Sequence, residues 1–435
     1  MNALKWFSLC LALCAPHSGA GQTLLSLDSC LVLAGRNSPQ LRSADNAVRA
    51  AGLARSELNT TALPQLQAVI DGIYIPVPPR YGYDPAITDG GEVRALISLR
   101  QSVYDAGLRG LKADQSSIDI ERLGSEQRLA MFDLTLAVKQ AYYESLRSRA
   151  EVVLQQGSVD QLEGYLGLVR RLYNGGSASA TDLLKSELQT STARVALARA
   201  REVSLGAILA LEEVMGVPPD TSLALADSLG EPSGLPSDSA AEGGFDPTST
   251  LDMTVAGMLV RRSMLEEDIT RHERHPEISL FADAGYLTSG DNLRLISSER
   301  VNGLGYEVGL GIQFPILNWG ATGLRTEQKE IATDDVRNRM ELLRRSIATD
   351  AVRLRVQLAG ARERLRVLRG NLTKANDNYI LMKSKFAAGA SLSLEVLSAQ
   401  QALTDARLAE LQTLADIRSF TARIERLHTR GEGTR

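Results

Sequence analysis

The sequence predicts a mixed α/β membrane protein in which long coiled-coil helices alternate with four short β-strands. Three observations support this fold class: the placement of proline, an internal repeat and the alternation of apolar residues in the strands. The chain has 435 residues, with no proline between Pro85 and Pro218 or after Pro315. Because proline breaks the interior of a helix, both stretches favour very long helices.

The chain contains two related halves. The segment from Tyr173 to Leu184 resembles the segment from Phe386 to Leu397, at an offset of 213 residues (386 minus 173). Constant spacing over several landmarks indicates an internal duplication. The matched landmarks are Tyr173 with Phe386, Gly176 with Gly389, Asp182 with Glu395, Asp105-Ala106-Gly107 with Asn318-Trp319-Gly320 and, at an offset of 212, Pro64 with Pro276 and Tyr74 with Tyr286.

Each half has the same predicted order of elements: a helix, a strand, a loop, a second strand and two long helices. We expect them in the first half at 24–62, 66–74, 75–92, 93–104, 108–156 and 159–214. In the second half, helices and strands are expected at 250–274, 277–287, 304–317, 322–384 and 391–428. The predicted domains are a signal peptide at 1–20, a first repeat at 21–216, a linker at 217–247 and a second repeat at 248–435.

The predicted strands have one apolar and one polar face. Tyr306, Val308, Leu310, Ile312 and Phe314 alternate with Glu307, Gly309, Gly311 and Gln313, and Val93, Ala95, Ile97 and Leu99 alternate with Arg94, Ser98 and Arg100. A period of two is typical of a sheet with one buried face. Tilted strands of about 9–11 residues can cross a bilayer. The strand patterns alone leave a soluble hairpin lying on a helix as an equal alternative.

The predicted helices carry coiled-coil spacing, with apolar residues at alternating steps of three and four. A helix of about 50 residues extends roughly 75 Å, which suits a rod or a tube better than a compact core. The seam residues are Leu129, Phe132, Leu136, Tyr143, Leu146, Ala150 and Val153 in one helix, and Leu184, Leu188, Ser191, Val195, Ala198, Glu202, Leu205 and Leu209 in the next.

The N-terminus has the pattern of an export signal. Lys5 precedes a short apolar run from Trp6 to Ala15, and the small residues Ser18-Gly19-Ala20 favour cleavage after Ala20. Leucine precedes both Cys10 and Cys14, so we do not expect acylation there. The processed chain keeps only Cys30 and cannot form an internal disulfide.

The sequence shows no pattern of an enzyme, and we expect no catalytic residues, no cofactor and no metal. It lacks a phosphate-binding loop, a nucleophile elbow and a Cys-x-x-Cys pair. His272 and His275 stand three residues apart, but Arg271 and Arg274 interleave with them and no further ligand is evident. The formal net charge of −4 gives no indication of nucleic-acid binding.

Four membrane strands in one chain imply an oligomer. Open sheet edges are costly in hydrocarbon because each unpaired backbone group costs several kcal/mol. Membrane barrels have at least eight strands, so two chains would give eight strands and three would give twelve. Two other interpretations stay open from the residues: a soluble periplasmic coiled-coil scaffold and a passive outer-membrane pore.

Several segments resemble the TolC family of outer-membrane efflux proteins, and the resemblance covers the whole processed chain. The matching segments are Ser26-Leu27-Asp28 with Asn37-Ser38-Pro39-Gln40-Leu41, Leu63-Pro64-Gln65-Leu66, Phe314-Pro315-Ile316-Leu317-Asn318-Trp319-Gly320, its first-half version Gln101-Ser102-Val103-Tyr104-Asp105-Ala106-Gly107, and the two segments Tyr173–Leu184 and Phe386–Leu397. Each motif is weak singly, whereas their order and duplication are specific.

The resemblance implies a homotrimer with a twelve-stranded barrel in the outer-membrane lipid and a twelve-helix α-helical barrel in the periplasm of a Gram-negative bacterium. It implies a periplasmic adaptor (membrane fusion) protein at the helix tips and an inner-membrane transporter that supplies energy. The resemblance further implies an exit duct of a tripartite efflux pump or a type I secretion system.

At the residue level, the resemblance implies that Tyr173, Gly176, Phe386 and Gly389 form hairpin tips that contact the adaptor. It also makes Asp182 and Glu395 candidates for a periplasmic gate. Asp182 has a second interpretation, as a carboxylate stabilised at the N-terminus of a helix. Ser391 and Ser398 stand where the family pattern would have a basic gating partner and a second acidic residue, so a two-ring ionic gate is not implied.

Overall fold

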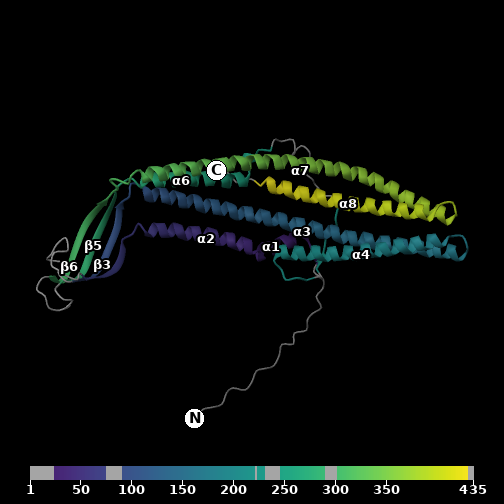
Figure 1. The fold of residues 1–435 in the computed structure, drawn as a ribbon, viewed down its shortest axis with the longest axis horizontal. Helices are drawn as coiled ribbons and strands as arrows, with labels where there is room; N and C mark the ends of the chain where they lie inside the picture. The colour runs from purple at the N-terminus through teal and green to yellow at the C-terminus, as the bar shows by residue number, and fades with distance from the viewer. Residues whose placement is uncertain (1–23, 75–90, 221–222, 231–244, 290–300, 430–435) are drawn as a thin grey trace, which may run out of the picture. The chain divides into compact units, whose positions relative to one another are not determined.

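A computed structural model describes residues 24–74, 91–220, 223–230, 245–289 and 301–429. Figure 1 shows the order of the elements along the chain. The chain forms two compact units, and each unit takes residues from both halves of the sequence. Unit 1 comprises Met1–Pro39, Asp133–Gly243 and Val352–Arg426, and unit 2 comprises Gln40–Phe132, Gly244–Ala351 and Leu427–Arg435.

Unit 1 consists of two helical hairpins and a short N-terminal helix. Figure 1 shows α4 beside the end of α3, and α8 beside the end of α7. A two-residue parallel pairing joins β1 to β4 within the same unit. The elements are β1 (Leu24–Leu25), α1 (Leu27–Asn37), the end of α3 (Leu108–Asn174), α4 (Ala180–Met215), β4 (Ala224–Leu225), the end of α7 (Ala321–Ala387) and α8 (Ser393–Leu427).

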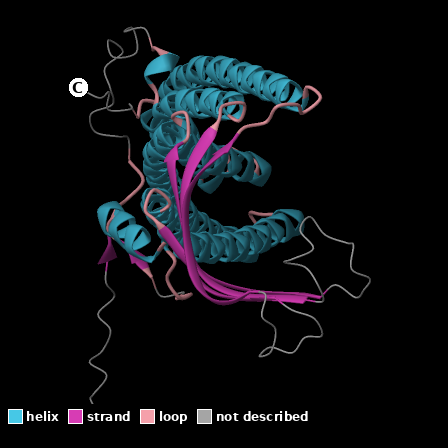
Figure 2. Ribbon diagram, turned by 90° about the vertical axis from the view of Figure 1, so that its left-hand side faces the viewer, coloured by secondary structure: helices cyan, strands magenta, loops and turns pink. Residues whose placement is uncertain are grey.

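Unit 2 combines helices with one antiparallel sheet, whose strand order is β2-β3-β5-β6. Figure 2 shows the four strands curving together as a single layer. The elements are α2 (Pro39–Thr60), β2 (Gln65–Tyr74), β3 (Gly91–Tyr104), the start of α3, the 3₁₀ turn η1 (Pro247–Ser249), α6 (Leu251–His272), β5 (Glu277–Ser289), β6 (Val301–Gln313) and the start of α7.

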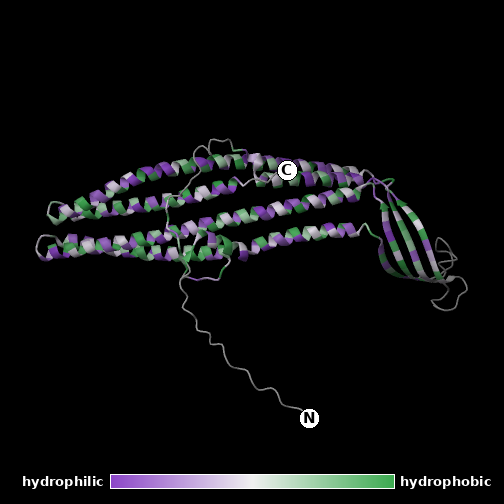
Figure 3. Cartoon of the chain, turned by 180° about the vertical axis from the view of Figure 1, so that it is seen from behind, coloured by the Kyte–Doolittle hydropathy of each residue, from purple (hydrophilic) through white to green (hydrophobic). Residues whose placement is uncertain are grey.

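The sheet has one apolar face that no other described part of the chain covers. Cross-strand pairs put Leu66 with Leu99, Ile97 with Ala284, and Tyr286 with Leu304 on this face. The alternation of hydrophobic and hydrophilic positions along these strands is visible in Figure 3. Leu66 is 70% exposed and Leu304 is 87% exposed. The predicted two-faced sheet is therefore confirmed, and its apolar side is free for another phase or another molecule.

The opposite face of the sheet carries the polar residues. Ser98 donates a hydrogen bond to the carboxylate of Asp283, which lies opposite it on β5. Arg94 of β3 forms an ion pair of 3.7 Å with Asp71 of β2. Among the described helices, none is long and apolar enough to cross a membrane.

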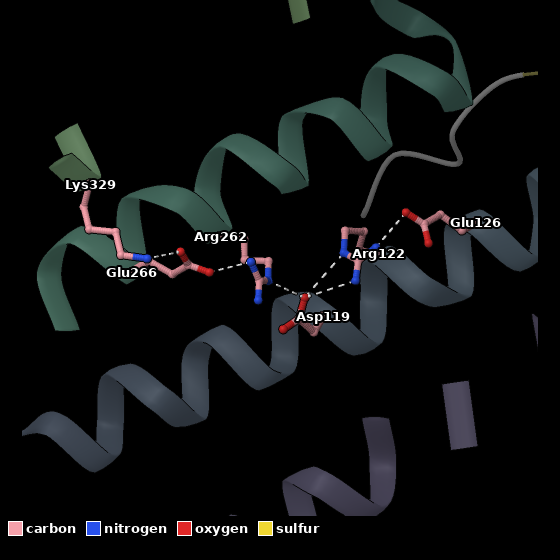
Figure 4. Close-up of polar contacts among 6 residues, drawn as sticks. All are labelled: Asp119, Arg122, Glu126, Arg262, Glu266 and Lys329. Carbon is pink, nitrogen blue, oxygen red and sulfur yellow. Dashed lines mark hydrogen bonds and ion pairs between the residues drawn. The ribbon is translucent and has the colours of Figure 1, made fainter. Parts of the chain in front are cut away.

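A chain of ion pairs connects three helices of unit 2, as Figure 4 shows. Arg262 of α6 bridges Asp119 of α3 at 2.9 Å and Glu266 of its own helix at 2.5 Å. Lys329 of α7 then pairs with Glu266 at 3.0 Å. Arg122, on α3, pairs with both Asp119 and Glu126. These partly exposed side chains connect α3, α6 and α7 on one side of unit 2, where each pair contributes about 1 kcal/mol at most.

The internal repeat extends to backbone geometry. The bounds of α3 and α7 differ by 213 residues at both ends (108 and 321, 174 and 387), as do the starts of α4 and α8 (180 and 393). Left-handed backbone angles recur at the same offset. The pairs are Ala106 (φ 54°) with Trp319 (φ 52°), Gly107 (88°) with Gly320 (81°) and Gly176 (74°) with Gly389 (73°).

Two predicted helix boundaries are wrong. The expected helix at 24–62 is interrupted, because Pro39 disfavours a helical conformation at the preceding Ser38, whose ψ is 117°. Ser38 instead caps α1, donating its N–H to Ala34 O at 2.9 Å, and α2 begins at Pro39. The expected break after residue 156 does not occur, because the neighbouring Ser158 and Val159 are buried by packing and α3 continues to Asn174.

Other expected boundaries shift by a few residues. The predicted strand at 304–317 ends at Gln313, since Pro315 cannot donate to a ladder. Residues 75–90 of the predicted loop, the signal peptide and its two cysteines lie outside the described residues.

The predicted coiled-coil seams differ from those that pack within the chain. On α4, Leu184, Leu188 and Val195 are 65%, 69% and 68% exposed. A second seam on the same helix is buried instead, formed by Ser186, Thr190, Ala193, Leu197 and Ala200. On α3, Leu146 of the predicted seam is buried, whereas Val153 is 69% exposed. On α4, the chain itself thus covers one seam and leaves the other exposed.

The reactivity of the Cys30 thiol can be used to test the packing of α1 in unit 1. Burial raises the pKa of its thiol from 9.0 to about 11, and the nearby Asp227 contributes to the shift. Because the thiolate is the reactive form, a shift of two units lowers its population at pH 8 by roughly 100-fold. We expect Cys30 to react with a maleimide at least about 100-fold more slowly than an exposed cysteine, with the rate still rising above pH 9.

The matched control is Val32→Cys in a Cys30→Ser background, because Val32 is 54% exposed on the same helix. Cys10 and Cys14 are replaced by serine in both proteins. Equal labelling rates of the two cysteines in the native protein would contradict the packing of α1, while equal rates in denaturant are expected.

Candidate functional site: the two hairpin turns

The candidate site lies in unit 1, where α3 turns into α4 and α7 turns into α8. Both long helices end with a glycine in the left-handed conformation, Gly176 and Gly389. Behind each glycine, the next N–H reaches back to the helix: Ser177 donates to Leu172 O at 2.8 Å, and Ala390 donates to Lys385 O at 2.9 Å. This is the Schellman arrangement, which satisfies the last carbonyls of a helix and needs glycine for its positive φ.

Asp182 takes part in capping the N-terminus of α4. Ser179 is the N-cap, its Oγ accepts from the N–H of Asp182 at 3.1 Å, and the Asp182 carboxylate accepts from the N–H of Ser179 at 3.2 Å. This reciprocal pair is a capping box, which satisfies two backbone donors that a helix otherwise leaves unpaired. The carboxylate also lies in the first turn, where the helix dipole favours negative charge. The structural interpretation of Asp182 is therefore confirmed.

Glu395 has the equivalent place at the start of α8, although its cap is incomplete. Its carboxylate accepts from the N–H of Leu392 at 3.2 Å and from the Ser391 hydroxyl at 2.6 Å. Leu392 replaces the capping serine and offers no side-chain oxygen in return. The Ser391 hydroxyl is the largest cause that lowers the pKa of Glu395 below 4.5, with smaller contributions from the Leu392 N–H and from Lys385. Glu395 is exposed and carries its charge at neutral pH.

The aromatic residues of the two turns lie in different surroundings. Tyr173 is 41% exposed, in accordance with its predicted place on the tip. Phe386 is only 7% exposed, and its ring lies 5.3 Å from the ring of Tyr165. The Phe386 ring therefore fills the core between the hairpins, and its contact with an adaptor stays a prediction.

Polar contacts connect the two hairpins across that core. The Tyr165 hydroxyl of α3 lies 2.9 Å from Ser393 Oγ of α8. Deeper in the unit, Gln400 donates to Ser158 Oγ at 2.8 Å and to Thr404 Oγ1 at 3.1 Å. All five residues are buried, so each hydrogen bond satisfies a group that would be costly to leave unpaired. Because both hairpins share this network and core, they are held in one register.

No pattern in the sequence predicts this network. Tyr165 and Gln400 belong to no motif, and Ser393 lies in the segment Phe386–Leu397 without a role assigned to it. The only sequence signal of the three is a polar residue at a position that the fold buries. The choice between a polar seam and a solvent-facing stripe depends on which side of the helix meets a neighbour. The spacing of polar and apolar residues alone does not show which side of the helix meets a neighbour.

His272 and His275 form no metal site with other described residues. Their rings lie 5.0 Å apart, and Nδ1 of His272 lies 2.8 Å from the Asp268 carbonyl oxygen of its own helix. Within the described ranges, no group of three or more His, Cys, Asp or Glu residues could hold a metal ion. The hairpin turns, by contrast, place two carboxylates in the first turns of α4 and α8.

Comparisons with known proteins agree with this architecture. A family model described as "Outer membrane efflux protein" matches residues 30–217 and again 250–428. The chain is 26% identical over 401 residues to the pyoverdine export outer membrane protein OpmQ of Pseudomonas aeruginosa, covering 89% of this chain and 81% of OpmQ. It is 24% identical over 328 residues to the alkaline protease secretion protein AprF of the same species, covering 72% and 64%.

Solved structures show the same fold. The outer membrane protein VceC of Vibrio cholerae superposes with a TM-score of 0.78 at 15% identity, covering 93% of this chain and 96% of VceC. CusC superposes with the same score at 16% identity, covering 93% and 92%.

Long paired hairpins joined to a four-stranded sheet with one uncovered apolar face define the class of outer-membrane export channels. The chain belongs to the outer membrane efflux protein family, because the family model matches most of its length. It is accordingly a protein of the outer membrane.

The difference between the two caps gives a testable prediction. Replacing an N-cap serine by alanine costs about 1 kcal/mol. We expect Ser179→Ala to speed amide hydrogen exchange in the first turn of α4 by roughly fivefold, since 1.4 kcal/mol corresponds to a factor of ten. Leu392→Ser should have the opposite effect on α8, because it completes the second capping box. Unchanged exchange in both variants would show that the caps do not hold these turns.

Proposed function

We propose that three copies of the chain form the exit duct of a tripartite efflux pump or a type I secretion system. In this proposal the duct receives cargo from a periplasmic adaptor and an inner-membrane transporter, releases it outside the cell and performs no chemistry. The observation that carries the proposal is the second, exposed seam of α4. Its large apolar residues are Leu184, Leu188, Val195, Leu205 and Leu209, each at least 40% exposed.

Two seams on one helix suit a closed ring of helices. The buried seam of α4 starts at Ser186 and the exposed seam at Leu184, and both then follow steps of three and four. A displacement of two residues turns the second seam about 200° around the helix. A helix with seams on opposite sides packs against a neighbour on each side, as in a tube wall. The chain supplies one neighbour, and a second copy would supply the other.

The sheet also supports assembly. Within the described residues, β2 and β6 each pair with one strand only and thus form the two edges. Edge groups left unpaired in hydrocarbon cost several kcal/mol each. If β6 of one copy pairs with β2 of the next, the same contact repeats head to tail and closes as a ring. Three copies then give twelve strands, as the TolC resemblance implies.

The hairpin turns are the proposed docking and gating end. Tyr173, Gly176 and Gly389 lie at the turns, with Leu392 (69% exposed) and Leu394 (58% exposed) beside them. We propose that these residues contact the adaptor, while Asp182 and Glu395 form acidic positions that favour cations at a narrow passage. The buried Phe386 would stabilise the turn between α7 and α8 by packing in the core. The relatives OpmQ and AprF are named for pyoverdine export and alkaline protease secretion, and they support export as the function of the proposed duct.

The first test concerns assembly. We expect Leu188→Glu to abolish the trimer, because three seams would each place a carboxylate in an apolar contact, and burying an unpaired charge is strongly unfavourable. The protein mass of the detergent-solubilised assembly by light scattering checks this expectation, and for the unmodified chain it should be three times the mass of one processed copy.

Thr192→Glu is the control for this variant, because Thr192 is exposed on the same helix and lies off the apolar seam. It should leave the trimer intact. If the Leu188→Glu protein still has the mass of a trimer by light scattering, the exposed seam of α4 does not belong to the interface between copies. An unmodified chain that stays monomeric in detergent and conducts no ions would contradict the duct itself.

The second test concerns the acidic residues of the turns. We expect Asp182→Asn with Glu395→Gln to reduce the preference for cations several-fold, measured as the reversal potential across a planar bilayer under a salt gradient. Glu213→Gln, an exposed carboxylate in the last turn of α4, should leave the preference unchanged. If Glu213→Gln reduced the cation preference as much as the double variant, the preference would come from the overall charge of the protein and not from the carboxylates of the turns.

The pH dependence follows from the direction of the pKa shift. Because the pKa of Glu395 is below 4.5, its negative charge persists as the pH falls through 4.5 and is lost only below the lowered value. The Glu395 contribution to cation preference should therefore survive at pH 4.5. A loss of half or more of that contribution at or above pH 4.5 would contradict the hydrogen bonds assigned to this carboxylate.

A further inference from the structure

A buried carboxylate lies at the C-terminal end of α4, in unit 1. Glu212 is only 1% exposed. Its Oε2 accepts a hydrogen bond from the N–H of Asp220 at 2.9 Å, so the carboxylate points past the last turn of the helix. Its Oε1 is buried and has no hydrogen-bond partner among the described residues, and no described basic side chain pairs with it. Because a buried carboxylate charge without a partner is strongly unfavourable, Glu212 requires a positive ligand.

Main-chain carbonyl oxygens gather at the same helix end. In a helix, the carbonyl of each residue accepts from the N–H four residues later. For Val214 and Met215 those residues are Pro218 and Pro219, which have no N–H to donate. The last carbonyls of α4 point out of the helix end, in the direction that the Glu212 carboxylate also takes. The last turn of α4 contains no basic residue that could balance them.

A second helix ends at this place. Gly216 follows α4 with a φ of 66°, and a Cβ added to it would lie 3.2 Å from Cβ of Asn37 and 3.5 Å from the Asn37 carbonyl oxygen. Asn37 is the last residue of α1, so the C-terminal ends of α1 and α4 meet. Pro39 follows α1 and, like the two prolines after α4, cannot donate to a helix carbonyl. Both helix ends therefore turn carbonyl oxygens toward one junction.

The charge at this junction matches one divalent cation. Each helix C-terminus carries about half a negative elementary charge, so the two ends and one carboxylate together carry about two. Ca²⁺ accepts six to eight oxygen ligands in irregular geometry, including carboxylates, main-chain carbonyls and water, whereas Mg²⁺ demands a near-ideal octahedron. A site built mainly from main-chain oxygens does not depend on a cluster of acidic or histidine side chains, and spacing in the sequence does not predict it.

We propose that Ca²⁺ binds at the junction of α1 and α4, with Glu212 Oε1 as its charged ligand and carbonyl oxygens of the helix ends and water as the others. The ion holds the end of α1 against the end of α4. Cys30 and Ala34 of α1 already pack with Leu211 and Met215 of α4 in one apolar core, and the ion closes the polar end of this contact. The proposal is independent of the duct and of the carboxylates at the hairpin turns.

The test is a Ca²⁺ titration of the full-length protein in detergent after removal of divalent cations with EDTA. Amide hydrogen exchange is measured in peptides that contain Val217 and Asp220. We expect Ca²⁺ to slow exchange with a midpoint of roughly 10⁻⁴–10⁻³ M, the range of extracellular calcium sites. At about ten times the midpoint concentration, exchange should be about tenfold slower, since bound ligand suppresses opening in proportion to its concentration.

Two neighbouring carboxylates supply a variant and its matched control. Glu212→Gln keeps the shape of the side chain and removes its charge, and the effect of Ca²⁺ should be lost. Glu213→Gln changes the exposed neighbour and should keep the effect. Maleimide labelling of Cys30 gives a second local readout: Ca²⁺ should slow it in the native protein and in Glu213→Gln, but not in Glu212→Gln. Calcium bound at the hairpin turns does not alter either readout.

Three outcomes would overturn the proposal. If Ca²⁺ leaves exchange at Val217 and Asp220 unchanged in the native protein, there is no site, and this measurement needs no variant. If Na⁺ at equal ionic strength protects as strongly as Ca²⁺, the ligand is not a divalent cation. If Glu212→Gln alone slows exchange without any cation, the buried carboxyl is neutral in the native protein. Each result, obtained on trimers that conduct ions, rejects the calcium site and leaves the exit duct standing.

Discussion

The requirement that backbone hydrogen bonds be paired in hydrocarbon is the constraint on which the rest of this structure depends. The four strands satisfy it internally, except along the outer sides of β2 and β6. The sheet also leaves Leu66, Ile70 and Leu304 uncovered, each at least 70% exposed. A single copy therefore has two incomplete features, open edges and an apolar face, which a membrane and further copies can complete together. The duct that we propose follows from meeting both needs at once.

The helices show the same incompleteness. Within unit 1, α4 packs through small or hydroxyl-bearing residues such as Ser186, Thr190 and Ala193, and its larger Leu188 and Val195 remain outside. Removing such a side chain fully from water contributes about 1.5–3 kcal/mol. The small residues allow close approach inside one chain, whereas the exposed larger ones are available for the assembly that we propose. In the trimer that we propose, folding and assembly would thus use opposite sides of one helix.

The two halves of the chain share a backbone and differ in the side chains placed on it. At corresponding positions, Tyr173 is exposed and Phe386 is buried, Ser179 completes a capping box and Leu392 leaves one incomplete. Ala106 and Trp319 share a left-handed conformation but differ in what they present to the surroundings. These differences lie beside the sheet and at the hairpin turns, where we place contacts with a partner protein. The two halves thus keep the same backbone geometry, and substitutions have made their side chains different.

The sequence by itself determined the repeat, the type of each main element and the two faces of the strands, because these depend on local spacing and on the conformations of proline and glycine. The resemblance also implied that Gly176 and Gly389 lie at hairpin tips, whereas the helix expected at 159–214 missed the break between α3 and α4. Only the tertiary structure decided that Phe386 is buried, that α3 passes through Gly157 and that the leucine seam of α4 faces outward. A spacing of three and four marks a helical stripe, but which neighbour covers that stripe depends on contacts between distant segments.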